Sequence, residues 1–350
     1  MKRALITGIT GQDGRHLSQF LTAKGYQVFG LVRGQNNPKT DLIQTENPAL
    51  EVVEGDLRDL SSLIAVVEQV QPDEVYNLGA ISFVQLSFKQ AELTAEITGL
   101  GVLRMIEATR IVGGVDNNPI RFYQASSSEM FGKVRETPQT EQTPFHPRSP
   151  YGVAKVFGHY TTVNYRDAYG MHASNGILFN HEGPMRGETF VTRKITRAVA
   201  AIERGLQQRL YLGNLDARRD WGHARDFVEG MWLMLQQPQP DDYVLATGET
   251  HSVREFAERA FACVGRTIEW SGKGAEEVGL DASTGADLVR IDPRYFRPTE
   301  VDDLLGDPAK ARAGLGWSHK TSFAELVAEM VASDLEVINR ERWRNDRSGR

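Results

Sequence analysis

The sequence has little cysteine and no long apolar run. Its 350 residues include a single cysteine, Cys263. That count excludes an intramolecular disulfide and a cysteine-rich zinc site, and it suits a reducing compartment, so we expect a cytoplasmic location. No stretch approaches the roughly 18 apolar residues that a membrane span needs, and the apolar start MKRALITGIT gives way to polar residues at Gln12 without a signal-peptide cleavage site. We therefore expect no membrane partner.

Positive charge is also not in excess. The chain carries 40 Lys and Arg against 46 Asp and Glu, a net charge of −6. A nucleic-acid-binding protein normally shows a basic excess, so nucleic acid is not expected as a partner. The eight histidines show no H-E-x-x-H spacing, and neither a Walker sequence nor G-x-S-x-G occurs. A catalytic metal, NTP hydrolysis and serine hydrolysis are therefore not expected.

Strands and helices alternate in the first half of the chain. Short apolar runs predict strands at residues 4–7, 26–32, 51–54, 74–78 and 121–126. Helical periodicity between these runs, as in the segment around residues 93–111, predicts crossover helices. Such alternation is typical of an α/β fold with a Rossmann-type doubly wound parallel sheet.

The alternation weakens after residue 185. Strands at 210–212 and 243–246 are expected to mix there with helices at 253–264 and 322–338, and the Gly-, Ser- and Asp-rich residues 271–287 predict a surface loop. We expect two units, since about 150 residues per domain is usual. These are a dinucleotide-binding domain at 1–185 and a smaller mixed α/β substrate domain at 186–339, with the chain crossing back between them. Residues 340–350 are expected to form a flexible tail.

A glycine turn opens the first predicted helix. Gly8, Gly11 and Gly14 follow the first strand with the spacing G-x-x-G-x-x-G. Glycines let the backbone approach a pyrophosphate, and the helix N-terminus supplies free N–H groups, so we expect a dinucleotide cofactor. Arg33 follows the second strand, where NAD-binding proteins carry an acidic residue, which favours the 2′-phosphate of NADP. The candidate cofactor-binding residues are Gly8, Thr10, Gly11, Gln12, Asp13, Gly14, Arg33, Asp56, Leu57, Leu78, Gly79, Ala80, Ser82, Leu93, Tyr151, Lys155, His181 and Arg186.

A tyrosine and a lysine lie four residues apart in the sequence YGVAK. This spacing puts Tyr151 and Lys155 on one face of a helix. A nearby cation favours the phenolate, so Tyr151 is expected to act as a base close to neutral pH. The pair follows a strand that ends in Ser127 and Glu129. Together with the glycine turn, this pattern resembles the extended short-chain dehydrogenase/reductase enzymes.

Longer segments carry a closer resemblance. They are QASSSEMFG (124–132), PRSPYGVAK (147–155), NHEGP (180–184), TFVTRK (189–194), LGNLD (212–216), RDWGH (219–223) and DPRYFRPTE (292–300). In these segments and in their order, from the glycine turn to about residue 335, the chain resembles the GDP-mannose 4,6-dehydratase family. The resemblance implies a hydro-lyase that converts GDP-mannose to GDP-4-dehydro-6-deoxy-mannose and water, as the first step toward GDP-deoxysugars. It also implies tightly bound, recycled NADP and a homodimer or homotetramer.

The resemblance assigns the catalytic roles to Ser127, Glu129, Tyr151 and Lys155. Tyr151 takes the proton of the mannose 4-hydroxyl while hydride leaves C4. Glu129 then takes the C5 proton as the C6 hydroxyl departs, and hydride returns to C6. Ser127 stands where the family usually has Thr and still offers a hydroxyl to the substrate.

The same resemblance places cations around the substrate's two phosphates. Lys194, Arg219 and Arg297 are the candidates, because Arg in particular matches phosphate geometry, and Glu300 suits the ribose hydroxyls. By position, His181 and Arg186 contact the cofactor. The candidate substrate-binding residues are Ser82, Ser127, Glu129, Tyr151, Asn180, Lys194, Arg219, Arg297 and Glu300.

Two alternatives stay open. One is another nucleotide-sugar reductase or epimerase of the same fold. A plain reductase needs only the Ser/Thr, Tyr and Lys trio, whereas loss of a β-hydroxyl needs a further acid/base, so Glu129 argues against it. The other is a non-catalytic NADP-binding sensor, which would not need Tyr151 and Lys155.

Overall fold

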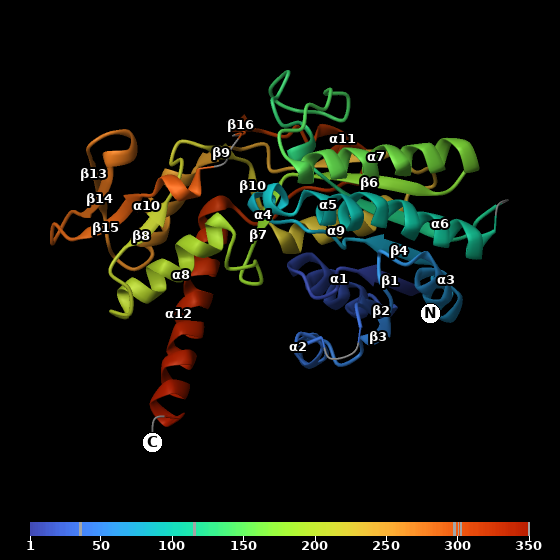
Figure 1. Cartoon of the computed structure of the whole chain (residues 1–350), viewed down its shortest axis with the longest axis horizontal. Helices are drawn as coiled ribbons and strands as arrows, with labels where there is room; N and C mark the ends of the chain where they lie inside the picture. Colours follow the sequence, from blue (N-terminus) through green and yellow to red (C-terminus); the bar gives the residue numbers. More distant parts are fainter. Residues whose placement is uncertain (35–36, 115–116, 297–298, 300, 302, 349–350) are drawn as a thin grey trace.

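The computed structural model describes residues 1–34, 37–114, 117–296, 299, 301 and 303–348. A seven-stranded sheet of order β11-β6-β5-β4-β1-β2-β3 forms its centre, and every neighbouring pair in this sheet is parallel. The strands are β1 (Arg3–Thr7), β2 (Gln27–Val32), β3 (Glu51–Glu54), β4 (Glu74–Asn77), β5 (Arg121–Ser127), β6 (Ala173–Leu178) and β11 (Asp242–Leu245). The predicted doubly wound parallel sheet is confirmed (Figure 1).

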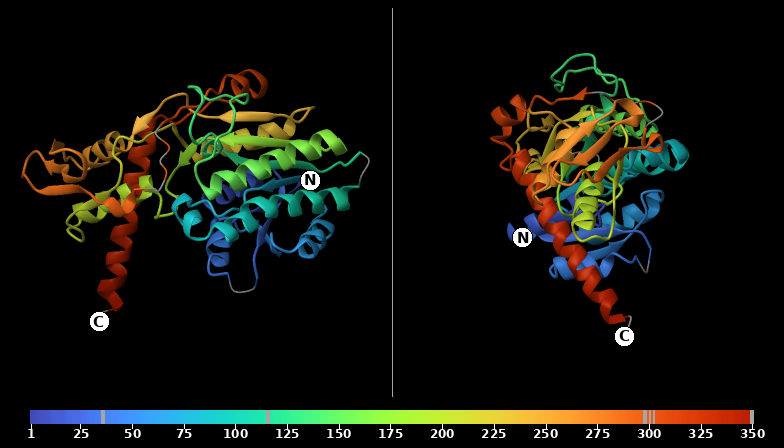
Figure 2. Two further views of the ribbon diagram at one scale, coloured as in Figure 1. Left: turned by 45° about the horizontal axis from the view of Figure 1, so that its top comes forward. Right: turned by 90° about the vertical axis from the view of Figure 1, so that its left-hand side faces the viewer.

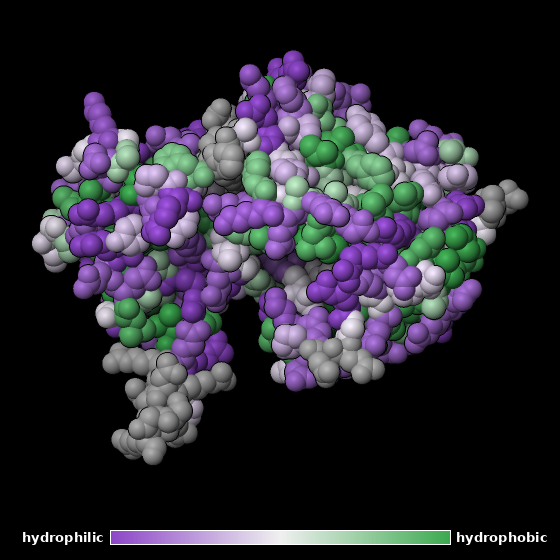
Figure 3. Space-filling view, in the orientation of Figure 1, coloured by the Kyte–Doolittle hydropathy of each residue, from purple (hydrophilic) through white to green (hydrophobic). Residues whose placement is uncertain are grey.

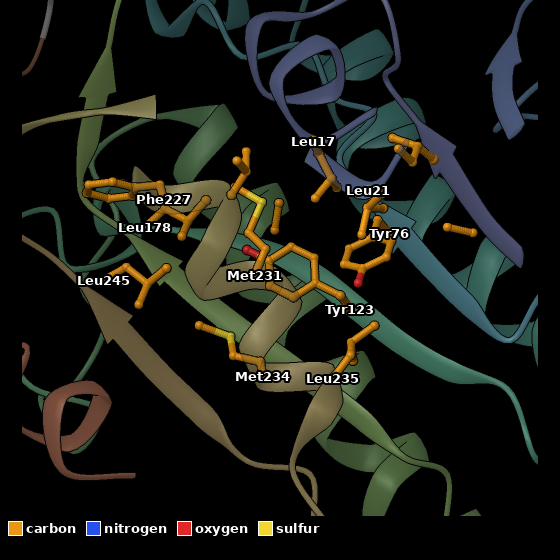
Figure 4. Close-up of a cluster of buried hydrophobic side chains, with 14 of the residues drawn as sticks. Leu17, Leu21, Tyr76, Tyr123, Leu178, Phe227, Met231, Met234, Leu235 and Leu245 are labelled. Carbon is orange, nitrogen blue, oxygen red and sulfur yellow. The ribbon is translucent and has the colours of Figure 1, made fainter. Parts of the chain in front are cut away.

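Helices cover both faces of this sheet, because its strands are apolar on both sides. The helices that surround it are α1 (Gln12–Ala23), α2 (Thr40–Glu46), α3 (Leu60–Val70), α4 (Val84–Lys89), α5 (Ala91–Thr94), α6 (Gly101–Gly113), α7 (Pro150–Tyr169), α9 (Ala224–Gln236) and α11 (Ala309–Leu315), with a π-helical stretch at Ala95–Leu100 and a 3-10 turn at Ser128–Met130. Helices α1 and α9 bury Leu17, Leu21 and Met231 against one face of the sheet, around Tyr76 and Tyr123 (Figure 4). Helices α3, α6 and α7 cover the other face.

Residues 243–246 were expected to form a short strand of the second unit, and the structure differs. Instead β11 pairs in parallel with β6, with Asp242 opposite Asn175, and it completes the edge of the large sheet. The reason is burial: Val244 and Leu245 are fully buried, and this edge position covers both faces of the strand. The expected crossing of the chain back to the first unit therefore includes both α9 and β11.

The second part of the chain builds smaller sheets. A four-stranded sheet has the order β13-β14-β15-β8, a three-stranded sheet has the order β12-β9-β16, and β10 pairs with β7. Their bounds are β7 (Asn180–Glu182), β8 (Leu210–Leu212), β9 (Arg218–Arg219), β10 (Trp221–His223), β12 (His251–Ser252), β13 (Ile268–Ser271), β14 (Val278–Asp281), β15 (Asp287–Ile291) and β16 (Asp303–Leu304), with helices α8 (Val191–Glu203), α10 (Val253–Ala262) and α12 (Phe323–Ser348) and 3-10 turns at Gly274–Glu276 and Pro293–Tyr295. Trp221, Phe256 and Leu326 lie in their common core.

Residues 271–287 are not only a surface loop, as their composition predicted. Strand β14 crosses this segment and pairs antiparallel with β13 and β15. Its Gly279 is needed for packing rather than for a turn, because a Cβ there would lie 2.9 Å from the Ile268 side chain. Glycine content alone therefore misled the prediction.

The C-terminal helix α12 also differs from expectation. It continues through Ser348, so residues 340–348 are helical rather than a flexible tail. Side chains near its end reach α8: Arg197 pairs with Glu341 (3.1 Å), and Arg204 donates to Asn339 (2.8 Å). Beyond these contacts the helix runs clear of the body (Figures 1 and 2). No helix in the described ranges is both long enough and apolar enough to span a membrane.

Candidate active site

A cavity of about 780 Å³ opens at the carboxyl ends of β1, β4, β5 and β6. This is the edge where the strand order reverses between β1 and β4, the usual ligand position in such sheets. Residues of the second part of the chain close its other side. The sequence-predicted residues that line the cavity are Gly8, Thr10, Gly11, Gln12, Asp13, Gly14, Leu78, Ala80, Ser82, Ser127, Glu129, Tyr151, Lys155, Asn180, His181, Arg186, Lys194 and Arg219.

Other predicted residues do not line this cavity. Arg33 is exposed. Asp56 faces Arg58 in an ion pair of 2.6 Å, and Leu57 is buried in the core. Gly79 packs closely behind the wall, where an added Cβ would lie 2.7 Å from Leu57.

Three further predicted residues also lie elsewhere or outside the described ranges. Leu93 is 37% exposed on α5 and does not line the cavity. Arg297 and Glu300 lie outside the described residues.

The glycine turn has no room for side chains at two of its three glycines. Gly8 has φ +70, and a Cβ there would lie 2.9 Å from the Gly79 nitrogen. A Cβ on Gly14 would lie 2.5 Å from the Gly8 carbonyl oxygen. Gly11 caps α1 in an extended conformation. These close contacts leave the first turn of α1 facing the cavity with its backbone N–H groups, and Gln12 places a buried Oε1 there that has no partner among the described residues. Such a cradle fits a dinucleotide phosphate.

The catalytic candidates come from β5 and the start of α7. Ser149 caps α7 by accepting a hydrogen bond from the Gly152 nitrogen (3.0 Å). Gly152 lies so close to the preceding loop that a Cβ would be 2.8 Å from the Glu129 carbonyl oxygen. This close packing brings Tyr151 and Glu129, both at least nine-tenths buried, to the same wall.

Burial controls the proton affinities of the pair. It raises the pKa of Tyr151 to about 12, an effect that Glu129 adds to and a hydrogen bond with Ser127 opposes. It lowers the pKa of Lys155 to about 8. The Lys155 ammonium donates to the Ala125 carbonyl oxygen (2.6 Å). Burial therefore outweighs the expected effect of Lys155, whose ammonium lies 5.7 Å from the centre of the Tyr151 ring, and the pKa of Tyr151 is raised rather than lowered.

Strand β7 carries two of the predicted site residues, Asn180 and His181, followed by Glu182. Asn180 places an Oδ1 that has no partner among the described residues, at the cavity wall. The Nε2 of His181 lies 2.8 Å from the Asp13 carboxylate of the glycine turn. Glu182 pairs with Arg186 (2.9 Å), which lies over the Phe190 ring.

Two of the three predicted phosphate cations, Lys194 and Arg219, line the cavity from the second part of the chain. Burial lowers the pKa of Lys194 to about 8, and its Nζ lies 3.0 Å from the centre of the Tyr295 ring. Arg219 lies in β9, next to Asp220. The buried Asp220 accepts hydrogen bonds from the Thr247 nitrogen and hydroxyl (2.8 and 2.7 Å), which fixes this strand.

The sequence analysis missed several lining residues: Lys39, Gln85, Phe190 and Tyr295. Tyr295 and Phe190 lie within the quoted segments DPRYFRPTE and TFVTRK, so the signal was present but no role was drawn from it. Among the described residues, no group of three or more His, Cys, Asp or Glu side chains is placed to hold a metal ion.

Comparison with known proteins covers nearly the whole chain. A family model described as GDP-mannose 4,6 dehydratase matches residues 5–330. The GDP-mannose 4,6-dehydratase of Sinorhizobium fredii is 56% identical over 344 residues, which cover 96% of this chain and 97% of the relative. The human GDP-mannose 4,6 dehydratase is 52% identical over 343 residues, covering 96% of this chain and 92% of the relative.

Solved structures agree on the fold. RMD from Pseudomonas aeruginosa, complexed with NADPH, matches with a TM-score of 0.75 at 21% identity, covering 96% of this chain and 100% of that one. The UDP-glucose 4-epimerase of Thermus thermophilus, in complex with NAD, matches with a TM-score of 0.77 at 26% identity, covering 95% of this chain and 98% of that one.

Proposed function

Because this chain belongs to the GDP-mannose 4,6-dehydratase family, we propose that its cavity residues carry out the dehydration of GDP-mannose in the roles given below. The chain is a hydro-lyase that converts GDP-mannose to GDP-4-dehydro-6-deoxy-mannose and water. The observation that carries the assignment of residues is that Ser127, Glu129, Tyr151 and Lys155 line the same cavity as the glycine turn.

Each of these side chains has a chemical task. Tyr151 accepts the proton of the mannose 4-hydroxyl, with Ser127 holding the same oxygen by a hydrogen bond. The resulting 4-ketone acidifies the C5 proton, which Glu129 removes and then transfers to the departing C6 hydroxyl, so that this group leaves as water. Tyr151 returns its proton to C5, so that both residues end the cycle in their starting states. Lys155 supplies a positive charge near the phenol whenever its amino group is protonated.

The cofactor is a nicotinamide dinucleotide, and we propose that it is NADP. The glycine turn and Lys155 would hold it, and when bound it would supply the acceptor for the C4 hydride and the donor of hydride to C6. Structural neighbours that carry NADPH or NAD support the class of cofactor. Two cations support the choice of NADP, because they are suited to its 2′-phosphate. Arg33 is exposed directly after β2, and Lys39 lines the cavity from the start of α2.

The GDP moiety is assigned to the second part of the chain. Lys194 and Arg219 lie at the end of the cavity away from the glycine turn and provide positive charge for the diphosphate. Arg297 and Glu300 retain their proposed roles toward phosphate and ribose from the sequence pattern.

The remaining proposals concern organisation. We keep two units, residues 1–185 and 186–339, with α9 and β11 of the second range joined to the first sheet. We place the protein in the cytoplasm. We also propose that it is a homo-oligomer, in which a second copy covers α7. On this helix Val153, Phe157 and Tyr160 are 57, 44 and 57% exposed, and Figure 3 shows apolar side chains gathered over this region. Exposed apolar patches of this kind mark interaction surfaces.

The direct test is to incubate the purified protein with GDP-mannose and no added cofactor, and to follow the sugar nucleotide by mass spectrometry. We expect the loss of one water with no net consumption of NADPH. Net NADPH consumption would indicate a reductase instead. No conversion, with NADP⁺ supplied and other nucleotide sugars offered, would overturn the substrate assignment and leave the fold unaffected.

A further inference from the structure

The glycine turn carries a negative charge where its proposed ligand is anionic. Asp13 is the second residue of α1, and its side chain lines the cavity. The positive end of the helix dipole and the free N–H groups of this first turn attract phosphate. A carboxylate at the same place repels it and cancels part of that attraction. The turn therefore needs a compensating cation to hold a dinucleotide.

His181 is the cation that contacts Asp13 directly, and Arg186 adds a weaker Coulombic attraction. Its Nε2 lies 2.8 Å from Asp13 Oδ2, and its Nδ1 lies 2.7 Å from the Phe179 carbonyl oxygen. Carboxylate and carbonyl oxygens can only accept, so both ring nitrogens must donate and the ring is an imidazolium. Burial alone would lower the pKa of His181, but the charge and hydrogen bond of Asp13 outweigh it and raise the pKa. The same contact holds the pKa of Asp13 well below its usual range.

The surroundings keep this ring in one orientation. His181 stacks on Phe227, with ring centres 4.8 Å apart and planes 21° from parallel. Gln12 makes a second link beside the ion pair, because its Nε2 donates to the His181 carbonyl oxygen (3.0 Å) and to Asp13 Oδ1 (3.2 Å). The pair therefore joins the glycine turn to β7, 168 residues later in the chain.

We propose that His181 is a positioning residue that neutralises Asp13 and fixes the glycine turn against β7, so that dinucleotide affinity depends on the charge balance of this pair. This role acts through Asp13 and is separate from the cofactor contact that the sequence pattern predicts for His181. It rests on the proposed nicotinamide dinucleotide. It also explains why a carboxylate is tolerated in a phosphate-binding turn.

The test is a charge-balance cycle, measured as the Kd of NADP⁺ by isothermal titration calorimetry on protein freed of co-purified dinucleotide. In His181→Gln the Asp13 carboxylate loses its hydrogen-bonded cation and keeps only the Coulombic attraction of Arg186, and we expect the Kd to rise at least about tenfold. In Asp13→Asn the histidine loses its partner and its charge together, so the Kd is expected to rise less than in His181→Gln, by under about tenfold. The double variant Asp13→Asn, His181→Gln is expected to recover the affinity of Asp13→Asn.

Several outcomes would overturn the proposal. A double variant as weak as His181→Gln would mean that a direct contact of the imidazole with the dinucleotide, and not charge balance, accounts for the loss. An unchanged Kd in His181→Gln would mean that the pair does not affect binding. If His181→Gln does not fold, Asp13→Asn alone decides, because a tenfold change there contradicts charge balance. As a matched control, His172→Gln removes a ring that bonds the Gln237 carbonyl oxygen (2.8 Å), and the Kd should not change.

Failure of the proposed cofactor is a separate result. If the starting protein binds neither NADP⁺ nor NAD⁺ and converts no GDP-mannose, the proposed function itself falls. If it binds NADP⁺ normally and the variants do not differ, only the role of the ion pair is rejected.

Discussion

At the scale of single residues, burial makes the catalytic lysine the group that titrates in the working range. The pKa of Lys155 is lowered to about 8, so its ammonium is charged below that pH and neutral above it. We therefore expect kcat/KM to fall as the pH rises through about 8, because the phenolate of Tyr151 loses its cation. A pH profile of GDP-mannose turnover measures this. Lys155→Arg, whose charge does not titrate, should lack this fall, and a flat profile in the starting protein would contradict the prediction.

The Glu129 carboxylate has a separate, testable task. Replacing it by Gln removes the base for the C5 proton without changing the size of the side chain. We expect Glu129→Gln to lower kcat by about 10²–10⁴ with little change in the Kd of GDP-mannose. Incorporation of solvent deuterium at C5 should fall in parallel. Glu269→Gln, on the exposed face of β13, is the control and should retain full activity. A variant at position 129 that keeps more than about a tenth of kcat would reject this role.

At the scale of elements, the glycines of the glycine turn have different tasks: Gly14 is needed for folding and Gly11 for dinucleotide binding. A Cβ on Gly14 would meet the Gly8 oxygen at 2.5 Å and Ile9 Cα at 2.6 Å, whereas one on Gly11 would meet only the Gly8 oxygen, at 3.2 Å. We expect Gly14→Ala to lose about 1–3 kcal/mol of stability through overpacking. Gly11→Ala should remain within about 1 kcal/mol but bind dinucleotide more weakly, because its methyl group enters the cradle. Urea unfolding and calorimetric titration of both variants measure this, and equal losses of stability would contradict the assignment.

A buried polar network fixes α7 over the sheet. Arg166 pairs with Asp242 of β11 (2.8 Å), and Asn175 of β6 donates to the same carboxylate (2.9 Å). Ser126 of β5 contacts His159 of α7 (3.1 Å) and Asn175 (3.2 Å). Through these contacts the helix of Tyr151 and Lys155 is held to the strand of Ser127.

Loss of the central carboxylate should destabilise the fold in a pH-dependent way. Burial opposes ionisation of Asp242, but Arg166, His159 and Asn175 together lower its pKa. The stabilisation is therefore present above the unfolded-state pKa of about 4 and is lost as the pH falls through the lower folded value. We expect Asp242→Asn to lose about 2–4 kcal/mol at neutral pH, and less below about pH 4, in urea unfolding. Asp241→Asn removes a half-exposed neighbour that pairs with Lys310, and it should lose under about 1 kcal/mol. Equal losses in the two variants would contradict this role of Asp242.

Local pattern predicted the local parts of this molecule. The glycine turn and the Tyr151–Lys155 pair depend on spacings of three and four residues, which the sequence displays directly. Strand β11 and the ion pair between Asp13 and His181 depend on partners far along the chain, and no periodicity reports those. The pKa values of Tyr151 and Lys155 differed from expectation for the same reason. They depend on burial, which is a property of the assembled cavity.

At the scale of the whole molecule, the exposed stripe on α7 should hold two copies together. We expect Phe157→Glu to convert the oligomer to a monomer in light scattering, because a buried carboxylate without a partner is costly. Leu206→Glu is the matched control: Leu206 is 59% exposed after α8, and its substitution should leave the mass unchanged. A Phe157→Glu protein with the mass of the starting oligomer would exclude this face.

The position of β11 in the chain also determines when the central sheet can be completed during synthesis. The sheet that holds the glycine turn and the catalytic residues has its last strand at Asp242–Leu245, and α9 covers α1 from residues just before it. A nascent chain that has emerged only to residue 185 therefore displays an unpaired edge on β6 and an uncovered face of α1. Unpaired edges are sites of aggregation. The ribosome must add about sixty more residues before β11 can complete the first sheet. During that interval the growing chain avoids aggregation through chaperones or through rapid synthesis.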